Sequence, residues 1–362
     1  MGNTIQARFG DTDNDYKRLK IQKGKPEVWE DGLRTTGEKG EYEWWYFDSA
    51  LDDGASLVIS FFTTSIASKE AGFHPYLEIR YTSPDGKKIS EDIYPTDFSF
   101  SEEKCDVKMD GNSITGNLHE VVIVLDGEHF KGKAVLTGRV SPWRPNSGYI
   151  YFGEDDYFAW LPSVPEGHVQ LTYSIDGGSE QEVSGTGYHD HNWGNCNMMK
   201  LMHHWYWGRA KIGEYQVISS YITAQKKYGY EHFPIFFLAK GEQVLGDDIT
   251  KLTYTQTNLQ YDEKINRHYY KDLCYDYVDG QSRYCITYRA EKILEDRYLI
   301  GDGDSIKAKA ERAALKAMGI MANYIRLNGE VTLEHYENGV KVEVVSAPAI
   351  WELMGFGLDE DV

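Results

Sequence analysis

Short runs in which apolar and polar residues alternate follow one another along most of the chain from Glu41 onward. Alternation over about four to eight residues, bounded by turn residues, is typical of β-strands that bury one face. Tight hairpin turns are expected at Asp279-Gly280, Asn328-Gly329 and Asn338-Gly339, because such pairs adopt positive φ easily. The pattern predicts antiparallel strands near residues 56–63, 76–82, 89–94, 119–125, 168–175, 205–209, 215–223, 233–239 and 282–290.

Three segments depart from this strand pattern. Residues 1–40 hold few hydrophobic side chains and several glycines and lysines, so we expect an irregular leader there. The ring-rich run from Tyr149 to Trp160 follows a proline-containing stretch, and it predicts a long loop that forms a lid or a pocket wall. The stretch 305–321 predicts one helix, capped by Ser305, whose apolar face begins with Ile306.

The length of the chain predicts more than one domain. At 362 residues it exceeds what a single hydrophobic core usually organises. Two β units of similar size, joined near residue 200, fit the strand pattern. We therefore expect an all-β fold with one helix near the C-terminus, a leader over residues 1–40, and β domains over residues 41–198 and 199–362.

Charge and composition narrow the class of partner. The 57 acidic and 38 basic residues give a net charge of −19, which repels nucleic-acid phosphates and anionic lipid surfaces. The four cysteines are too sparse and irregularly spaced for a disulfide framework. Without a run of about 18 apolar residues, stable membrane insertion is not expected, and the cytoplasm is the default location. Aromatic residues make up 14% of the chain, which fits both a small-molecule site and a strand-rich fold.

Ionisable side chains gather near the midpoint of the chain, in residues 185–194 (GTGYHDHNWG). In an extended strand, alternate side chains point to opposite faces. One face would then carry Tyr188, Asp190 and Asn192, and the other His189, His191 and Trp193. The expected partners of this stretch are two aromatic-rich segments, residues 43–48 (EWWYFD) and 203–208 (HHWYWG).

Metal binding is one chemistry that these residues allow, since neutral imidazoles such as His189 and His191 suit zinc, copper or non-haem iron. A third ligand at a defined spacing is missing, and the adjacent His203 and His204 would point to opposite faces of a strand. We therefore expect no metal site. The sequence also lacks a Gly-x-Ser-x-Gly nucleophile elbow and a complete dinucleotide fingerprint, so neither a serine nucleophile nor a nicotinamide or flavin cofactor is indicated.

General acid chemistry remains, centred on Asp190. Burial among rings would raise the pKa of its carboxyl and make it a proton donor, whereas pairing with an imidazolium would lower that pKa. In the alternative, Asp190 and Asn192 form a polar tie to backbone groups. Glu43 also has two interpretations: it is either a polar group of the pocket or a solvated residue at the start of a strand. The sequence leaves both alternatives open for each residue.

Four motifs together resemble the AttH/CrtC family: residues 43–47 (EWWYF), 187–194 (GYHDHNWG), 205–208 (WYWG) and 350–354 (IWELM). This family includes carotenoid 1,2-hydratases, also called hydroxyneurosporene synthases, together with bacterial terpenoid cyclases and the lipocalin-like Diels–Alderases of fungal polyketide pathways. The resemblance spans about residues 41–356. It implies two tandem lipocalin-like β domains, a hydrophobic pocket near their junction, and no metal or organic cofactor.

The resemblance also implies an enzyme of specialised metabolism that accepts an apolar isoprenoid or polyene. In the hydratase and cyclase branch an aspartate protonates an alkene, and Asp190 is the matching position, tuned by His189, His191 and Tyr188. We expect Asp190, one of the two adjacent tryptophans in 43–48 and one of those in 205–208 to line a single cavity. A pericyclase that needs no acid, and a carrier that leaves its ligand unchanged, are the alternatives. The residues expected to bind substrate are Glu43, Trp44, Trp45, Tyr46, Asn192, Trp193, His203, Trp205, Tyr206 and Trp207.

Overall fold

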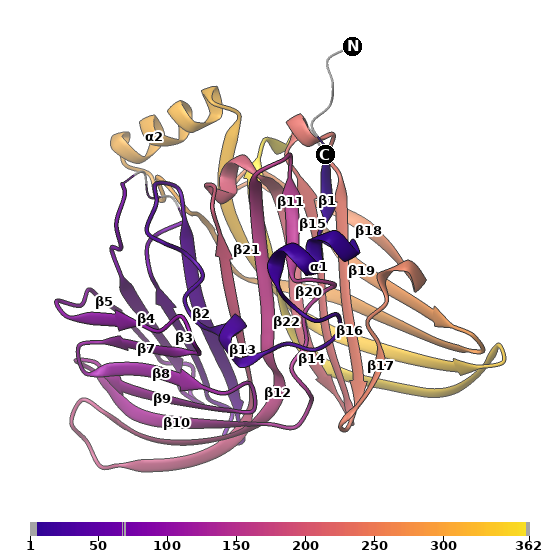
Figure 1. Ribbon diagram of the computed structural model, residues 1–362, viewed down its shortest axis with the longest axis horizontal. Coiled ribbons are helices and arrows are strands. Elements are labelled where there is room, and N and C mark those ends of the chain that lie inside the picture. Colours follow the sequence, from indigo (N-terminus) through magenta and orange to yellow (C-terminus); the bar gives the residue numbers. More distant parts are fainter. Residues whose placement is uncertain (1–5, 67, 69, 360–362) are drawn as a thin grey trace. The chain divides into compact units, whose positions relative to one another are not determined.

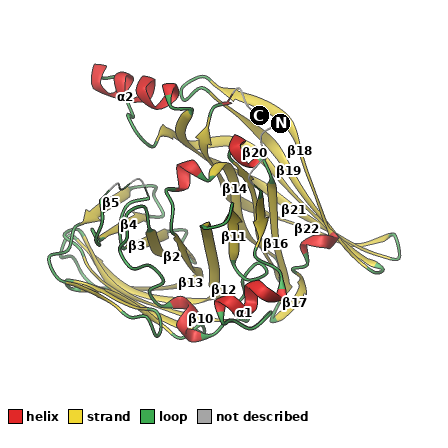
Figure 2. Ribbon diagram, turned by 45° about the horizontal axis from the view of Figure 1, so that its top comes forward, coloured by secondary structure: helices red, strands yellow, loops and turns green. Residues whose placement is uncertain are grey.

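The computed structural model describes residues 6–66, 68 and 70–359, and nearly all of their regular structure is β (Figure 2). The predicted all-β class is confirmed. Two α-helices occur within the described residues, α1 (Asp13–Leu19) and α2 (Ile306–Ala317). Neither of them is long and apolar enough to cross a membrane. The chain divides into two compact units, an N-terminal unit over Phe9–Met198 and a C-terminal unit that consists of Met199–Val362 together with the residues up to Arg8.

The N-terminal unit is built on one antiparallel sheet. Its strands, with the short β1 that leads into them, are β1 (Ala7–Phe9), β2 (Tyr42–Leu51), β3 (Ser56–Phe62), β4 (Tyr76–Thr82), β5 (Lys88–Ile93), β6 (Phe98–Phe100), β7 (Asp106–Met109), β8 (Asn112–Gly116), β9 (Glu120–Asp126), β10 (Phe130–Gly138), β11 (Tyr149–Phe152), β12 (Asp156–Ile175) and β13 (Gln181–Gly194). The main path runs β5-β4-β3-β2-β13-β12-β10-β9-β8-β7-β6, and β11 pairs with β12 (Figure 1). The sheet curls around its core, because Tyr81 of β4 reaches Tyr173 of β12 with 3.1 Å between their hydroxyls.

The C-terminal unit is a second curled antiparallel sheet. Its strands are β14 (Met202–Ile212), β15 (Tyr215–Ala224), β16 (His232–Lys240), β17 (Gln243–Gly246), β18 (Leu252–Asp262), β19 (Arg267–Asp279), β20 (Ser282–Tyr298), β21 (Ile320–Glu337) and β22 (Val340–Gly357). They pair in the order β17-β16-β15-β14-β22-β21-β20-β19-β18. Phe236 of β16 stacks on Tyr277 of β19 at 5.3 Å between ring centroids, which closes the core across the sheet.

The run from Tyr149 to Trp160 is a hairpin, so the predicted long loop was wrong. Strand β11 pairs with the start of β12, with Tyr149 opposite Ala159. The proline-containing stretch that suggested a loop, residues 142–145, lies before this hairpin. Two further prolines, Pro162 and Pro165, lie inside β12 and fall at two register shifts between β12 and β13. A bulge leaves backbone groups outside the ladder, which is where a strand tolerates a residue without an N–H donor.

The expected leader also contains regular structure. Helix α1 begins with a capping box, in which the side chains of Thr12 and Asp15 each accept a hydrogen bond from the other's backbone N–H. A single 3-10 turn, η1 (Val28–Asp31), follows it. The segment predicted as irregular therefore supplies ordered side chains to the N-terminal unit.

Turn and helix signals in the C-terminal unit were partly correct. Asn338 and Gly339 form the predicted turn, with φ of 52° and 77°. Gly329 instead lies inside β21, where an added Cβ would come within 2.0 Å of the carbonyl oxygen of Arg289. Ser305 caps α2 as predicted, but the helix ends at Ala317 before a left-handed glycine, and the expected apolar face is wrong because Ile306 is 89% exposed.

The different exposures of two isoleucines in the C-terminal unit predict different losses of stability when each is replaced by alanine. Ile325 is fully buried in the core, so Ile325→Ala should lower the free energy of unfolding by about 2–5 kcal/mol. Ile306→Ala should change it by less than about 0.5 kcal/mol. Urea titration read by hydrogen exchange of peptides from this unit measures both values. Equal losses in the two variants would contradict the placement of α2.

Candidate functional site

Strand β13 lies between β2 and β12, and its side chains separate into two chemical groups. Asp190 lies opposite Tyr46 of β2, and His191 lies opposite Trp45. Directly opposed side chains share a face of the sheet. We call the side with Tyr188, Asp190 and Asn192 the carboxyl face, and the side with His189, His191 and Trp193 the histidine face. The predicted alternation along this stretch is confirmed.

On the carboxyl face, three side chains hold the carboxyl of Asp190. The Tyr188 hydroxyl donates to Oδ2 at 2.6 Å, and the Trp160 indole Nε1–H donates to the same oxygen at 2.7 Å. Asn192 donates to Oδ1 at 2.7 Å. Asp190 is only 4% exposed, and its partners are side chains, so it is not the tie to backbone groups that the sequence left open.

Burial and hydrogen bonding act in opposite directions on Asp190. Burial raises the pKa of its carboxyl, and the hydrogen bonds from Tyr188 and Trp160 lower it, with a net pKa above the ordinary value. Burial and the charge of Asp190 hold the pKa of Tyr188 well above its usual range. Tyr188 therefore stays a hydrogen-bond donor, and the protonated form of Asp190 is favoured relative to an exposed aspartate.

A row of aromatic rings continues the carboxyl face across the sheet. Trp44 lies opposite Asn192 on one side and opposite Phe62 of β3 on the other. Tyr76 of β4 follows in the same row and stacks on Phe62 with 4.3 Å between ring centroids. Trp44, Phe62, Tyr76 and the neighbouring Tyr46 are all half-buried, so they offer apolar surface beside the carboxyl.

On the histidine face, both imidazoles are fully buried and each contacts a carboxylate. His189 donates from Nδ1 to the carbonyl of Tyr46 at 2.7 Å, and its Nε2 lies 3.3 Å from Oδ2 of Asp31. Burial acts to lower the pKa of His189, but the charge of Asp31 and these hydrogen bonds outweigh it and raise that pKa. His189 and Asp31 thus form a buried ion pair.

His191 and Glu43 form the second contact of this face. Nε2 of His191 lies 2.7 Å from Oε1 of Glu43, and its ring stacks on Trp45 at 4.7 Å. Glu43 also accepts hydrogen bonds from the backbone of Arg34 and from the backbone and hydroxyl of Thr35. Glu43 is therefore neither a solvated strand start nor exposed to a ligand, because its partners join the leader to β2.

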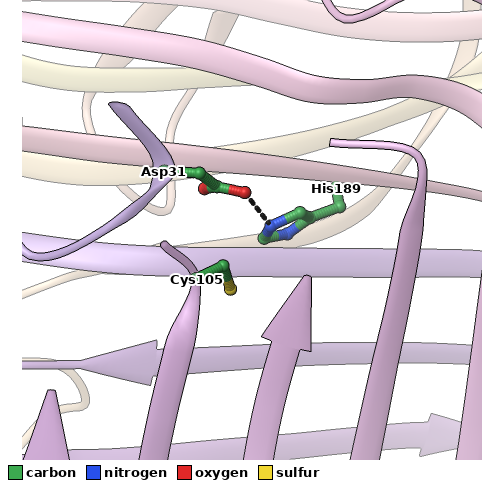
Figure 3. Close-up of side chains that lie close together, drawn as sticks. All are labelled: Asp31, Cys105 and His189. Atoms are coloured by element: carbon green, nitrogen blue, oxygen red, sulfur yellow. Dashed lines mark hydrogen bonds and ion pairs between the residues drawn. The ribbon is translucent and has the colours of Figure 1, made fainter. Parts of the chain in front are cut away.

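Within the part of the chain that the structure describes, Asp31, Cys105 and His189 form a cluster whose ligand atoms are close enough together to hold a metal ion (Figure 3). Their ligand atoms lie within 4.8 Å of one another, and all three residues are buried. Burial and the charge of Asp31 raise the pKa of the Cys105 thiol well above its usual range, which opposes thiolate ligation. The ion pair between His189 and Asp31 by itself explains why these two side chains lie in contact.

The two histidines of β14 do not point to opposite faces, so that prediction was wrong. The Nδ1 atoms of His203 and His204 lie 2.8 Å apart. A register shift between Met202 and His204 places a bulge at His203, and a bulge reorients the extra side chain. Burial and His203 hold the pKa of His204 well below its ordinary value.

The other expected binding residues are distributed over both units. Trp193 is buried and donates to the Tyr149 hydroxyl at 3.1 Å. Tyr206 is buried in the core of the C-terminal unit, where its hydroxyl accepts the backbone N–H of Tyr270 at 2.8 Å. Trp205 and Trp207 are half-buried. A shared cavity of these tryptophans with Asp190 stays a prediction.

Two residues of the site were missed by sequence reasoning. Trp160 donates to Asp190 from 30 residues away, and it lay in the run taken for a loop. The continuous apolar run from Tyr157 to Leu161, which is consistent with a strand buried on both faces, was the signal that could have found it. Asp31 meets His189 across 158 residues of chain, and the leader carries no local pattern that marks it.

Comparison with known proteins agrees with the four motifs. A family model described as Diels-Alderase-like matches residues 31–273. The chain is 30% identical over 83 residues to the quinolone epoxide rearrangement protein asqO of Emericella nidulans, covering 23% of this chain and 22% of that protein. It is 28% identical over 212 residues to hydroxyneurosporene dehydrogenase of Chlorobaculum tepidum, covering 47% of this chain and 54% of that protein. The matches therefore span about a fifth and about half of these relatives.

Solved structures with the same fold extend over nearly the whole chain. CghA with Sch210972 has a TM-score of 0.60 at 13% identity and covers 92% of this chain and 96% of its own. A putative AttH from Nitrosomonas europaea has a TM-score of 0.54 at 15% identity and covers 91% and 96%. This likeness confirms the lipocalin-like fold, and the family match confirms the resemblance indicated by the motifs.

The raised pKa of His189 makes its contribution to stability depend on pH. A group whose pKa is higher in the folded chain stabilises fully below its unfolded pKa of about 6.5, and loses that effect as pH rises through the folded value. The stability advantage of the wild type over His189→Gln should therefore be greatest below the unfolded pKa of about 6.5 and should shrink as the pH rises above it.

Chemical denaturation at several pH values measures this difference. Asn112→Ala is a suitable control, because it removes a buried side chain that has no titrating group and donates to the carbonyl of Met109 at 3.2 Å. Its destabilisation should be constant over the same range. A His189→Gln difference that is equally constant would contradict the buried ion pair.

Proposed function

The chain belongs to the Diels-Alderase-like family, and we propose that it is a cofactor-independent enzyme of specialised metabolism that protonates an alkene of an apolar isoprenoid or polyene. The observation that carries this proposal is the buried Asp190 carboxyl, held by three donors beside a half-buried row of rings. The raised pKa of Asp190 supports a role as the proton donor.

The hydrogen bonds indicate which oxygen of Asp190 carries the proton. Oδ2 accepts from both Tyr188 and Trp160, whereas Oδ1 accepts from Asn192 alone, so Oδ1 has room for a proton. Its transfer forms a C–H bond with the alkene π electrons and leaves a cation on the adjacent carbon. Water then adds and loses a proton, which is hydration, or a second alkene attacks and a proton is lost, which is cyclisation.

The same contacts stabilise the products of proton transfer. The carboxylate that remains keeps hydrogen bonds from Tyr188, Trp160 and Asn192, and such charge-assisted bonds are stronger than neutral ones. The rings of Trp44 and Tyr46 offer cation–π stabilisation to the carbocation, worth up to about 2 kcal/mol per desolvated ring. A network arranged in advance around the developing charge lowers the barrier without reorganisation.

A pericyclase is the second candidate, and the Diels-Alderase-like family match favours it. Such an enzyme folds a linear polyene so that the two reacting ends approach each other, and needs no proton donor. The half-buried rings beside Asp190 suit this role equally, because they present flat apolar surface.

Reaction in D₂O separates the two candidates. Protonation of an alkene should place one solvent deuterium on carbon in every product molecule, and Asp190→Asn should lower turnover about 10²- to 10⁴-fold. The exposed Glu103→Gln is a control that should leave turnover unchanged. Products from linear polyene and isoprenoid panels are analysed by mass spectrometry. Product without deuterium, formed equally well by Asp190→Asn, would overturn the acid mechanism and leave the pericyclase.

Trp160→Phe tests how the carboxyl is tuned. Loss of its donor destabilises the carboxylate, so the pKa of Asp190 should rise further above its ordinary value. Since the acid works in its protonated form, the fall in kcat at alkaline pH should move to higher pH as well. A pH profile that keeps its position while kcat drops would show that Trp160 has only a structural role.

A further inference from the structure

A cavity of about 320 Å³ lies within the C-terminal unit, away from Asp190 in the sequence. Residues of helix α2 form one wall, and the rest comes from the ends of β18 and β20 with the loops that follow them, the start of β21 and the segment after β22. Its apolar lining consists mainly of half-buried aliphatic and thioether side chains: Ile300, Leu315, Ile320, Met321 and Leu358. Their partial exposure inside a concave site is typical of a small-molecule pocket.

Two tyrosines and an asparagine supply neutral polar groups to this cavity. Asn266 donates to the Tyr298 hydroxyl at 2.8 Å, and the Tyr261 hydroxyl donates to Oδ1 of Asn266 at 3.2 Å. These contacts hold both phenol rings at the cavity. The rings therefore present a fixed amphipathic surface rather than mobile side chains.

The charges of the cavity favour an anion. Asp359 is the one carboxylate among the described lining residues, and the backbone N–H and ring Nδ1 of His268 bind it at 2.7 and 2.5 Å. The lining also holds two cations, Arg312 and Lys316. With Asp359 already engaged, the local balance is positive, although the chain carries a net charge of −19.

Arg312 is oriented before any ligand arrives. Its guanidinium lies over the Tyr298 ring, 4.6 Å from the centroid, and donates to the carbonyls of Gly301 and Gly303. A charge fixed in this way loses little conformational entropy when a ligand binds. Arg312 is thus a structural part of the pocket as well as a source of positive potential.

We propose that this cavity is a binding site for a small apolar molecule that carries one anionic group, such as a carboxylate. The aliphatic lining and the Tyr261 and Tyr298 rings receive the apolar body, and the cations on α2 attract the anion. The volume lies at the lower end of ordinary ligand pockets, which restricts the ligand to a ring system or short chain. The site does not depend on the chemistry of Asp190.

Isothermal titration of the full-length protein with 2-naphthoate and 2-naphthamide tests this site. The two probes share their rings and differ in charge, so naphthoate should bind at least about tenfold more tightly. Leu315→Trp fills the cavity and should abolish binding of both probes. Equal affinity for the two probes, absence of saturable binding, or binding that survives Leu315→Trp would each overturn the proposal.

A matched pair of variants on α2 distinguishes binding of the anion at the cavity from its general attraction to the positive charge of the helix. Lys316→Gln should weaken naphthoate several-fold and leave naphthamide unchanged. Lys307→Gln makes the same change in net charge on the same helix, where its side chain is 87% exposed and outside the cavity lining, and should change neither affinity. Equal weakening by both variants would show attraction to the helix surface alone. Hydrogen exchange of α2 peptides confirms that each variant keeps the helix.

Discussion

The central constraint on the N-terminal unit is that β13 is buried on both faces while it carries polar and charged side chains on each. Buried polar groups require partners, since each unmet one destabilises the fold by about 1–3 kcal/mol. On the histidine face the partners come from elsewhere in the chain: Asp31 from the leader for His189, and Glu43 from β2 for His191. The leader is therefore part of the folded unit because β13 needs its carboxylate.

This constraint also fixes the register of β13. A slip of one residue would exchange the two faces and place Asp190 among the groups that now surround His189 and His191. The ion pair with Asp31 and the contact with Glu43 oppose such a slip. Contacts on the histidine face thereby keep the carboxyl of Asp190 beside the aromatic row on the carboxyl face. Structural charges and the candidate proton donor thus occupy opposite sides of one strand.

Sequence reasoning succeeded where the information is local and failed where it is distant. The alternation of residues 188–193 depends only on strand geometry, and the turn at Asn338-Gly339 depends only on backbone preference. The contact of Trp160 with Asp190 depends on strand pairing through two bulges that prolines obscure, and the contact of Asp31 with His189 depends on the path of the leader. The direction of the His203 side chain was predicted wrongly because a bulge interrupts the alternation of β14. The burial of Ile306 was predicted wrongly because helical periodicity does not say whether a helix face packs against another element.

The opposing effects on Asp190 are what a proton donor requires. Burial without hydrogen bonds would make its carboxyl too weak an acid to protonate an alkene, and hydrogen bonds in an exposed position would leave it ionised and without a proton. In the proposed mechanism, the two effects together favour the protonated form before transfer and stabilise the carboxylate after it. In a pericyclase the charge of this carboxyl would not change during the reaction, so the three donors would have no catalytic effect. Their convergence on Asp190 therefore favours proton transfer over a pericyclic reaction.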